Sequence, residues 1–312
     1  MLFPNHYFWN MTIMQKENYK NIICFGEVLW DMLPSGAKPG GAPLNVAIHL
    51  IKNGLHPTLI SKTGTDKMGD RLVGFLEKSG LNTAAIQKDT ELPTSEVLVH
   101  LDENKNATYE ICEPVAWDNI TINSEILNSA KNSGLIIYGS LAARNKTTRN
   151  TLFRILEEST ASRLVDINLR APYDSRDWIE ELLHISDFVK LNDDELIKIT
   201  GWHNKNGNEE ELIHWLSDYF KCPTVCVTRG SKGAILFINN IFYSHAGFKV
   251  NAVDTVGAGD SFLAGLVASL SKNIHPEKAL ERACATGAFV ASREGAVPYY
   301  SENEIDKITY IK

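Results

Sequence analysis

The chain has 312 residues, of which 44% are hydrophobic and 22% charged, so it can bury a large core and wholesale disorder is excluded. Its 31 Lys and Arg residues against 38 Asp and Glu residues give a net charge of −7, which excludes a general basic surface for nucleic acid or anionic lipid. No run of about 18 apolar residues is present, so no membrane partner is expected either. Five scattered cysteines favour free thiols in a reducing cytoplasm over disulfides or a zinc site.

The first residues differ in character from the rest. Phe3, Tyr7, Phe8 and Trp9 stand among polar residues, without the continuous apolar stretch and small-residue cleavage site of a secretory signal. Residues 1–20 are therefore expected to form a disordered tail, followed by a main domain over residues 21–312. Met11 and Met14 leave open where translation begins.

Beyond residue 20, short apolar runs alternate with amphipathic stretches. Apolar runs of this length predict buried parallel strands, at residues 22–25, 135–138, 164–167, 188–191 and 224–227. Apolar residues at helical spacing predict helices around residues 72–76 and 152–156. This alternation predicts a three-layer, doubly wound α/β fold, with helices on both faces of a mostly parallel sheet.

Two segments depart from that pattern and predict antiparallel pairs. Residues 95–101 alternate in polarity and precede a polar turn and a second strand at 107–112. We expect them to belong to a small β lid drawn from about residues 31–40 and 93–118. A second hairpin is predicted from residues 234–238 and 241–244.

Two motifs near the start of the domain could bind a polar ligand. Asp31 follows the first predicted strand, where the carboxyl ends of parallel strands form the ligand crevice, or it is simply a solvated loop acid. Gly40 and Gly41 would let a ligand approach the backbone, and Asn45 can donate to and accept from a hydroxyl. An ordinary loop-to-helix junction explains the same residues equally well.

The strongest signal is the string from Asp254 to Asp260. Gly257, Ala258 and Gly259 open an apolar helix with small side chains, so the free amides and the positive end of the helix dipole can bind an anion. Asp260 lies in the first turn, where a carboxylate next to a phosphate suggests a base that takes a proton from an attacking hydroxyl. Alternatively, Asp260 only complements the helix terminus.

These motifs, in this order and spacing, resemble the ribokinase-like (PfkB-type) carbohydrate kinases from about residue 21 to the end of the chain. The resemblance implies a ribokinase-like fold with a β lid, and phosphorylation of a sugar hydroxyl by ATP. It implies that Asp260 is the catalytic base, that Gly257, Ala258 and Gly259 form the anion hole, and that Asp31, Gly40, Gly41 and Asn45 bind the sugar.

Further positions match the family's nucleotide and metal contacts. Asn192 and Glu195 resemble its Asn-x-x-Glu motif, which implies Mg²⁺ held there through water. The remaining nucleotide-binding positions implied by the resemblance are Thr228, Gly230, Gly233, Gly259 and Cys284. Cys284 stands where the family usually has Asn near the adenine, so that contact is expected to change.

Within the family, the sequence is most similar to fructokinases. Gly40-Gly41-Ala42-Pro43 resembles fructokinases. The Asp-x-Asn-x-Arg at 166–170 resembles fructokinases and 2-keto-3-deoxygluconate kinases, and it implies substrate contacts from Asn168 and Arg170. Strand-end polar pairing would also explain these polar residues. Fructose to fructose 6-phosphate is the expected reaction, with 2-keto-3-deoxygluconate kinase, ribokinase or a nucleoside kinase as alternatives.

The sequence also bears on a monovalent cation, on the oligomeric state and on other classes of protein. Asp254, Val256 and Gly295 match the family's monovalent-cation loop, so K⁺ is a possible activator, although Tyr299 stands where ribokinases often have Ser. The protein is expected to be a monomer or a homodimer. Two alternatives belong to other classes of protein. A non-catalytic sugar-binding regulator would have lost Asp260 or the glycines, and a nicotinamide dehydrogenase would need Gly-x-Gly-x-x-Gly after the first strand.

Overall fold

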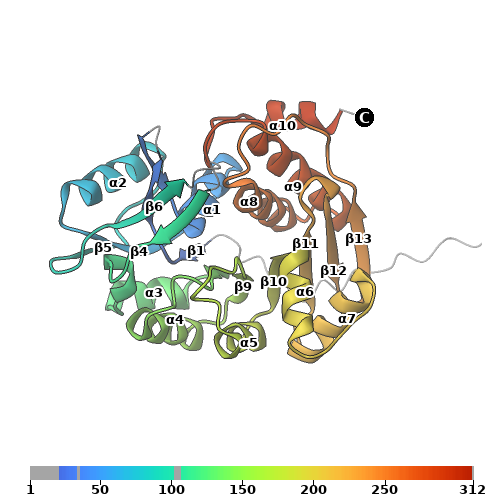
Figure 1. The fold of residues 1–312 in the computed structure, drawn as a ribbon, viewed down its shortest axis with the longest axis horizontal. Coiled ribbons are helices and arrows are strands. Elements are labelled where there is room, and N and C mark those ends of the chain that lie inside the picture. The colour runs from blue at the N-terminus through green and yellow to red at the C-terminus, as the bar shows by residue number, and fades with distance from the viewer. Residues whose placement is uncertain (1–20, 34–35, 102–106, 311–312) are drawn as a thin grey trace, which may run out of the picture.

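The computed structural model describes residues 21–33, 36–101 and 107–310. The tail predicted at residues 1–20 lies outside the described residues. In the part that is described, no helix is long and apolar enough to cross a membrane. The fold consists of one large sheet between two layers of helices, with a second, smaller sheet at one end (Figure 1).

The large sheet has nine strands in the order β13-β12-β11-β10-β9-β8-β1-β4-β5. The bounds are β1 Ile22–Phe25, β4 Thr58–Gly64, β5 Ile86–Asp89, β8 Leu135–Gly139, β9 Ser162–Asp166, β10 Phe188–Asn192, β11 Thr224–Thr228, β12 Ala234–Ile238 and β13 Ile241–His245. All neighbours from β5 to β11 pair in parallel, and β12 and β13 form the antiparallel hairpin at the other edge.

Helices cover both faces of this sheet, and each face has its own apolar core. One layer contains α1 Ala42–Lys52, α2 Lys67–Lys78, α8 Ala258–Ser271 and α9 Pro276–Ala291. The other contains α3 Ser124–Lys131, α4 Lys146–Glu158, α5 Arg176–His184, α6 Asp193–Gly201 and α7 Glu209–Phe220. α10, Glu302–Thr309, packs on α9, and a short 3₁₀ turn, Gly230–Lys232, follows β11. The predicted three-layer, doubly wound fold is therefore confirmed.

The second sheet has four strands in the order β3-β2-β6-β7. Their bounds are β2 Leu29–Leu33, β3 Gly36–Gly40, β6 Ser95–Leu101 and β7 Ala107–Ile111. The pair β6–β7 is antiparallel as predicted, but β2 and β6 run parallel, so the sheet is mixed. Residues 116–119, at the end of the expected lid, form a 3₁₀ turn whose Trp117 is fully buried in the large core.

The sequence analysis missed two strands of the large sheet. β4 contains Ser61, Lys62 and Thr63, and β5 contains Gln87 and Lys88, so neither shows a continuous apolar run. Both are nevertheless held in the sheet, because Lys62 is buried and paired with Asp89 at 2.9 Å. A buried charge that is paired in this way is compatible with a strand interior.

Candidate active site

The site is centred on the first turn of α8. Gly257, at its N-cap, has φ of 76°, and a Cβ there would lie 2.5 Å from the carbonyl oxygen of Ala296. Only glycine fits this left-handed, crowded position without strain. The first amides of a helix have no partner within it, so Gly257 and Gly259 present donors at the positive end of the helix dipole, whereas the Ala258 amide donates to the carbonyl oxygen of Thr255 at 3.2 Å.

Asp260, in the same turn, is held by a residue far away in sequence. Nδ2 of Asn45, on α1, donates a hydrogen bond of 2.8 Å to Oδ2 of Asp260. Burial raises the pKa of Asp260 to about 6, and the negative charge of Asp166 adds to that rise. Lys190 and the hydrogen bond from Asn45 act in the opposite direction. A carboxylate with this pKa is ionised at neutral pH and can still accept a proton.

Asp31 lies in the second sheet, beside the turn that leads into α1. Gly40 pairs with Leu29 across the sheet, and its missing side chain leaves room for the Asp31 carboxylate. Burial raises the pKa of Asp31 to about 6, while Arg170 lowers it. Gly41 has φ of 110°, and a Cβ there would lie 2.5 Å from the carbonyl oxygen of Glu27. The two glycines therefore let the turn into α1 approach the Asp31 side chain and the backbone between β1 and β2.

The loop after β9 brings a cation to these carboxyl groups. The exposed Arg170 lowers the pKa of Asp31, Asp260 and the buried Glu27, so its charge acts on all three. Asn168, in the same loop, adopts the left-handed region with φ of 42°. The loop is fixed by Glu195, whose Oε1 accepts from the Leu169 amide at 2.7 Å.

Asn192 and Glu195 form a reciprocal cap at the start of α6. Oδ1 of Asn192 accepts from the Glu195 amide, and Oε2 of Glu195 accepts from the Asn192 amide, both at 2.8 Å. Both side chains are thus already bound to backbone, which fits a cation held through its water shell but not a dry ligand set. Among the described residues, no group of three or more acidic, His or Cys side chains could hold a metal.

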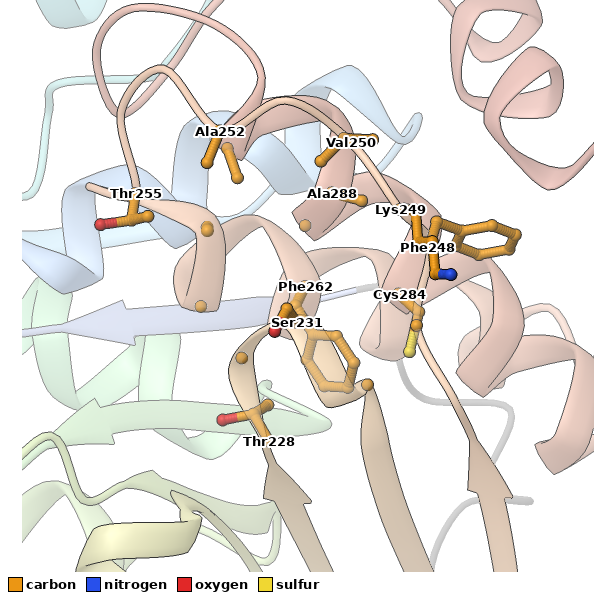
Figure 2. A pocket seen from close by; sticks show the side chains of 17 residues that line it. Thr228, Ser231, Phe248, Lys249, Val250, Ala252, Thr255, Phe262, Cys284 and Ala288 are labelled. Carbon is orange, nitrogen blue, oxygen red and sulfur yellow. The ribbon is translucent and has the colours of Figure 1, made fainter. Parts of the chain in front are cut away.

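A cavity of about 460 Å³ opens beside the same turn of α8 (Figure 2). Its walls come from the loop after β11, the segment before α8, and the facing sides of α8 and α9. Predicted nucleotide-binding residues among its walls are Thr228, Gly230, Gly233, Gly259 and Cys284. Asn192 and Glu195 are not among the residues that line it. The cavity is mainly apolar around Phe248 and Phe262, as a flat heterocycle would require.

The predicted cation loop is also assembled. Oδ1 of Asp254 accepts from the Val256 amide and Oδ2 from the Gly295 amide, each at 3.0 Å. Asp254 thereby joins the segment before α8 to the segment after α9. The segment after α9 is also bonded to α1, because Nζ of Lys52 donates to the carbonyl oxygens of Val297 and Pro298 at 2.8 and 2.6 Å.

Two charged residues of the site, Glu27 and Lys190, were missed by the sequence analysis as functional candidates. Glu27 is 3% exposed, its Oε1 accepts from the Ala42 amide at 3.2 Å, and burial raises its pKa to about 7. Lys190, in β10, donates to both carboxylate oxygens of Asp166 at 2.9 Å. The available signal was a lysine inside an apolar strand, since a charge at such a position must be paired.

Comparisons with known proteins agree with the predicted family. The model of the pfkB family carbohydrate kinases matches residues 8–302. Fructokinase-2 from Oryza sativa subsp. japonica is 29% identical over 306 residues, covering 89% of this chain and 90% of that protein.

Two solved structures have the same fold. A fructokinase from Xylella fastidiosa with bound ATP superimposes with a TM-score of 0.80 at 21% identity, over 93% of this chain and 98% of its own. A fructokinase from Vibrio cholerae O395, in a form with bound fructose, ADP and calcium ion, gives a TM-score of 0.79 at 23% identity. The superposition covers 93% of this chain and 99% of that chain.

Proposed function

The chain belongs to the pfkB family of carbohydrate kinases, and we propose that it transfers the γ-phosphoryl group of ATP to D-fructose, giving fructose 6-phosphate. The observation that carries this proposal is the Asn45–Asp260 hydrogen bond of 2.8 Å at the start of α8. It holds a basic carboxylate in the first turn of α8, which borders the cavity, and the charge of Arg170 acts on both this carboxylate and Asp31. That arrangement suits proton removal from a hydroxyl beside a transferring phosphoryl group.

Each part of the site has a role in this reaction. ATP would lie in the cavity beside α8, with its terminal phosphates at the turn formed by Gly257, Ala258 and Gly259, where the amides of Gly257 and Gly259 would donate to them. Asp31 and Asn45 would bind sugar hydroxyls, and Asp260 would take the proton of the attacking hydroxyl as the new P–O bond forms. Closure of the second sheet over the sugar would exclude water, which competes with the sugar as acceptor.

Two cations fit the residues present. Asn192 and Glu195 would hold Mg²⁺ through its water shell, since their side chains are already engaged with backbone amides. Bound there, the ion would neutralise charge on the phosphates of ATP. Asp254, Val256 and Gly295 would place a monovalent cation such as K⁺ behind the anion-binding turn.

Fructose is favoured over other sugars by two observations. A plant fructokinase is 29% identical over most of the chain, and two bacterial fructokinases share the fold. In addition, Asn168 and Arg170 occupy the loop that faces Asp31 and Asp260, where the family resemblance puts substrate contacts.

The test is ADP release from ATP and Mg²⁺ with fructose, ribose, glucose, 2-keto-3-deoxygluconate, adenosine and fructose 6-phosphate, each supplied separately. The Asp260→Asn protein, purified in the same way, measures any contaminating kinase. Fructose should give the highest kcat/KM. A clear preference for another acceptor would contradict the substrate assignment, and sugar binding without ADP release would point to a non-catalytic regulator.

A further inference from the structure

The side chain of Lys190, a residue of β10, reaches the first turn of α8, where phosphate is proposed to bind. Its Nζ is 3.2 Å from the position that a Cβ would occupy at Gly259. The side chain is 9% exposed, so the ammonium group is almost entirely removed from water. The absence of a side chain at Gly259 therefore leaves the ammonium in direct contact with the turn that is proposed to bind phosphate.

The hydrogen bonds of Lys190 leave one donor unused. An ammonium group has three N–H donors, and the two carboxylate oxygens of Asp166 accept at 2.9 Å each. Within the described residues, no third acceptor is bonded to Nζ. Burial opposes the charged form, but the carboxylates of Asp166 and Glu195 outweigh it and hold the pKa of Lys190 above its ordinary value. The group is therefore a cation at neutral pH.

A second buried pair in the same sheet shows what a purely structural lysine looks like. Lys62, in β4, lies 2.9 Å from Asp89, and the two side chains are 9% and 5% exposed, against 9% and 6% for Lys190 and Asp166. Lys62 also donates to the carbonyl oxygen of Asn119 at 2.9 Å. Each ammonium group thus has two acceptors among the described residues, and the two lysines differ in position: Lys62 lies between Asp89 and Asn119, whereas Lys190 lies at Gly259, in the turn that is proposed to bind phosphate.

We propose that Lys190 is a catalytic residue whose free N–H contacts the phosphoryl group as it passes from ATP to the sugar. Backbone amides at a helix terminus supply partial positive charge, and Lys190 adds a full charge where negative charge is transferred. Asp166 fixes the direction of the side chain, since it holds two of the three donors. This inference rests on the proposed kinase function, but not on the identity of the sugar.

The test uses two single variants that both break the ion pair. Lys190→Gln removes the cation, whereas Asp166→Asn keeps it. Binding of a β,γ-imido analogue of ATP and of AMP is measured by calorimetry with Mg²⁺ and without sugar, together with the melting temperature. We expect Lys190→Gln to weaken binding of the analogue by roughly 10–100-fold, with AMP affinity within about twofold of the wild type. Asp166→Asn should retain most of the preference for the analogue over AMP.

The matched control is Lys62→Gln, which breaks a pair of the same burial and should leave both affinities within about twofold. Equal losses of analogue affinity in Lys190→Gln and Asp166→Asn would overturn the proposal, because the ion pair rather than the cation would then matter. Unchanged analogue affinity in Lys190→Gln would overturn it as well. If fructose proves not to be the substrate, these results still stand, since no sugar is present in the binding experiment.

Discussion

Asp260→Asn tests the proposed base directly, because Asn keeps the shape of the side chain but cannot accept the proton. The amide oxygen of Asn can still accept the hydrogen bond that Asn45 Nδ2 now donates to Asp260 at 2.8 Å. General base catalysis contributes about 10²–10⁴-fold to the rate, so kcat should fall by at least 10²-fold. The affinities for sugar and ATP should change little, because each is bound mainly by other residues.

The same substitution should stabilise the fold. The pKa of Asp260 is raised from 3.8 to about 6 by burial, so at pH 7 the folded state holds a carboxylate that is better solvated in the unfolded chain. A shift of about two units corresponds to about 3 kcal/mol, which is an upper value because Asp260 is partly exposed and solvent screens its charge. The gain should shrink to about 0.5 kcal/mol at pH 4, since the folded-state carboxyl is then protonated and uncharged.

The assay combines kcat, ligand affinities and melting temperature for one variant and one control. Asp177, an exposed acid in the first turn of α5, provides the control. Asp177→Asn should lose about 0.3–1 kcal/mol of stability with unchanged kcat, as expected for an acid that only complements a helix dipole. If Asp260→Asn behaves like this control, with a lower melting temperature and near-normal turnover, Asp260 is not the base.

Three further outcomes are expected. The value of kcat/KM should fall about tenfold per pH unit below pH 6, because Asp260 must be ionised and its pKa is about 6; a profile that stays flat to pH 5 would contradict this role. Asp31→Ala should weaken fructose binding by roughly 10–100-fold and leave ATP affinity within about twofold, as separate titrations can show. The free energy of unfolding should be about 2 kcal/mol lower at pH 5 than at pH 8 owing to His49 alone, because burial lowers its pKa from 6.5 to about 3 and only the unfolded state gains the proton. Urea titrations of wild type and His49→Gln at both pH values would isolate this contribution, and equal pH dependence in the two proteins would refute it.

The features that were predicted from sequence are those that depend on neighbours in the chain. The apolar strands, the two hairpins and the small residues at the start of α8 each leave a local pattern, and the structure contains them all. β4 and β5 were missed because Lys62 and Lys88 interrupt the apolar pattern that marks a buried strand. The parallel pairing of β2 with β6 joins segments more than sixty residues apart, and no local pattern specifies its direction.

The assembly of the candidate site depends on contacts of this longer range. Asn45 and Asp260 are separated by 215 residues, and only the packing of α1 against α8 brings them to 2.8 Å. The burial of Glu27 is also a long-range effect. In the sequence it is an acid that follows a strand, and only the folded structure shows that it is buried and accepts from the Ala42 amide at the start of α1. A sequence pattern can identify the chemical type of each residue. The pKa of Asp260, however, depends on Asp166 in β9 and Lys190 in β10, which approach it only in the folded structure.

The two buried lysines of the large sheet show why the sequence alone does not separate a structural charge from one that could bind a ligand. Lys62 and Lys190 both occur within strands of the large sheet and both pair with an aspartate, so the sequence alone predicts the same structural role for each. They differ in their second acceptor and in their position: Lys62 donates to the backbone carbonyl of Asn119, whereas Lys190 donates only to Asp166 and lies at Gly259. A buried charge whose surroundings are only protein groups contributes to the fold, whereas a buried charge at the proposed anion-binding turn is also positioned for a ligand. Distinguishing the two requires the position of each ammonium group, and Lys190 meets Gly259 only because the fold brings the start of α8 to this strand.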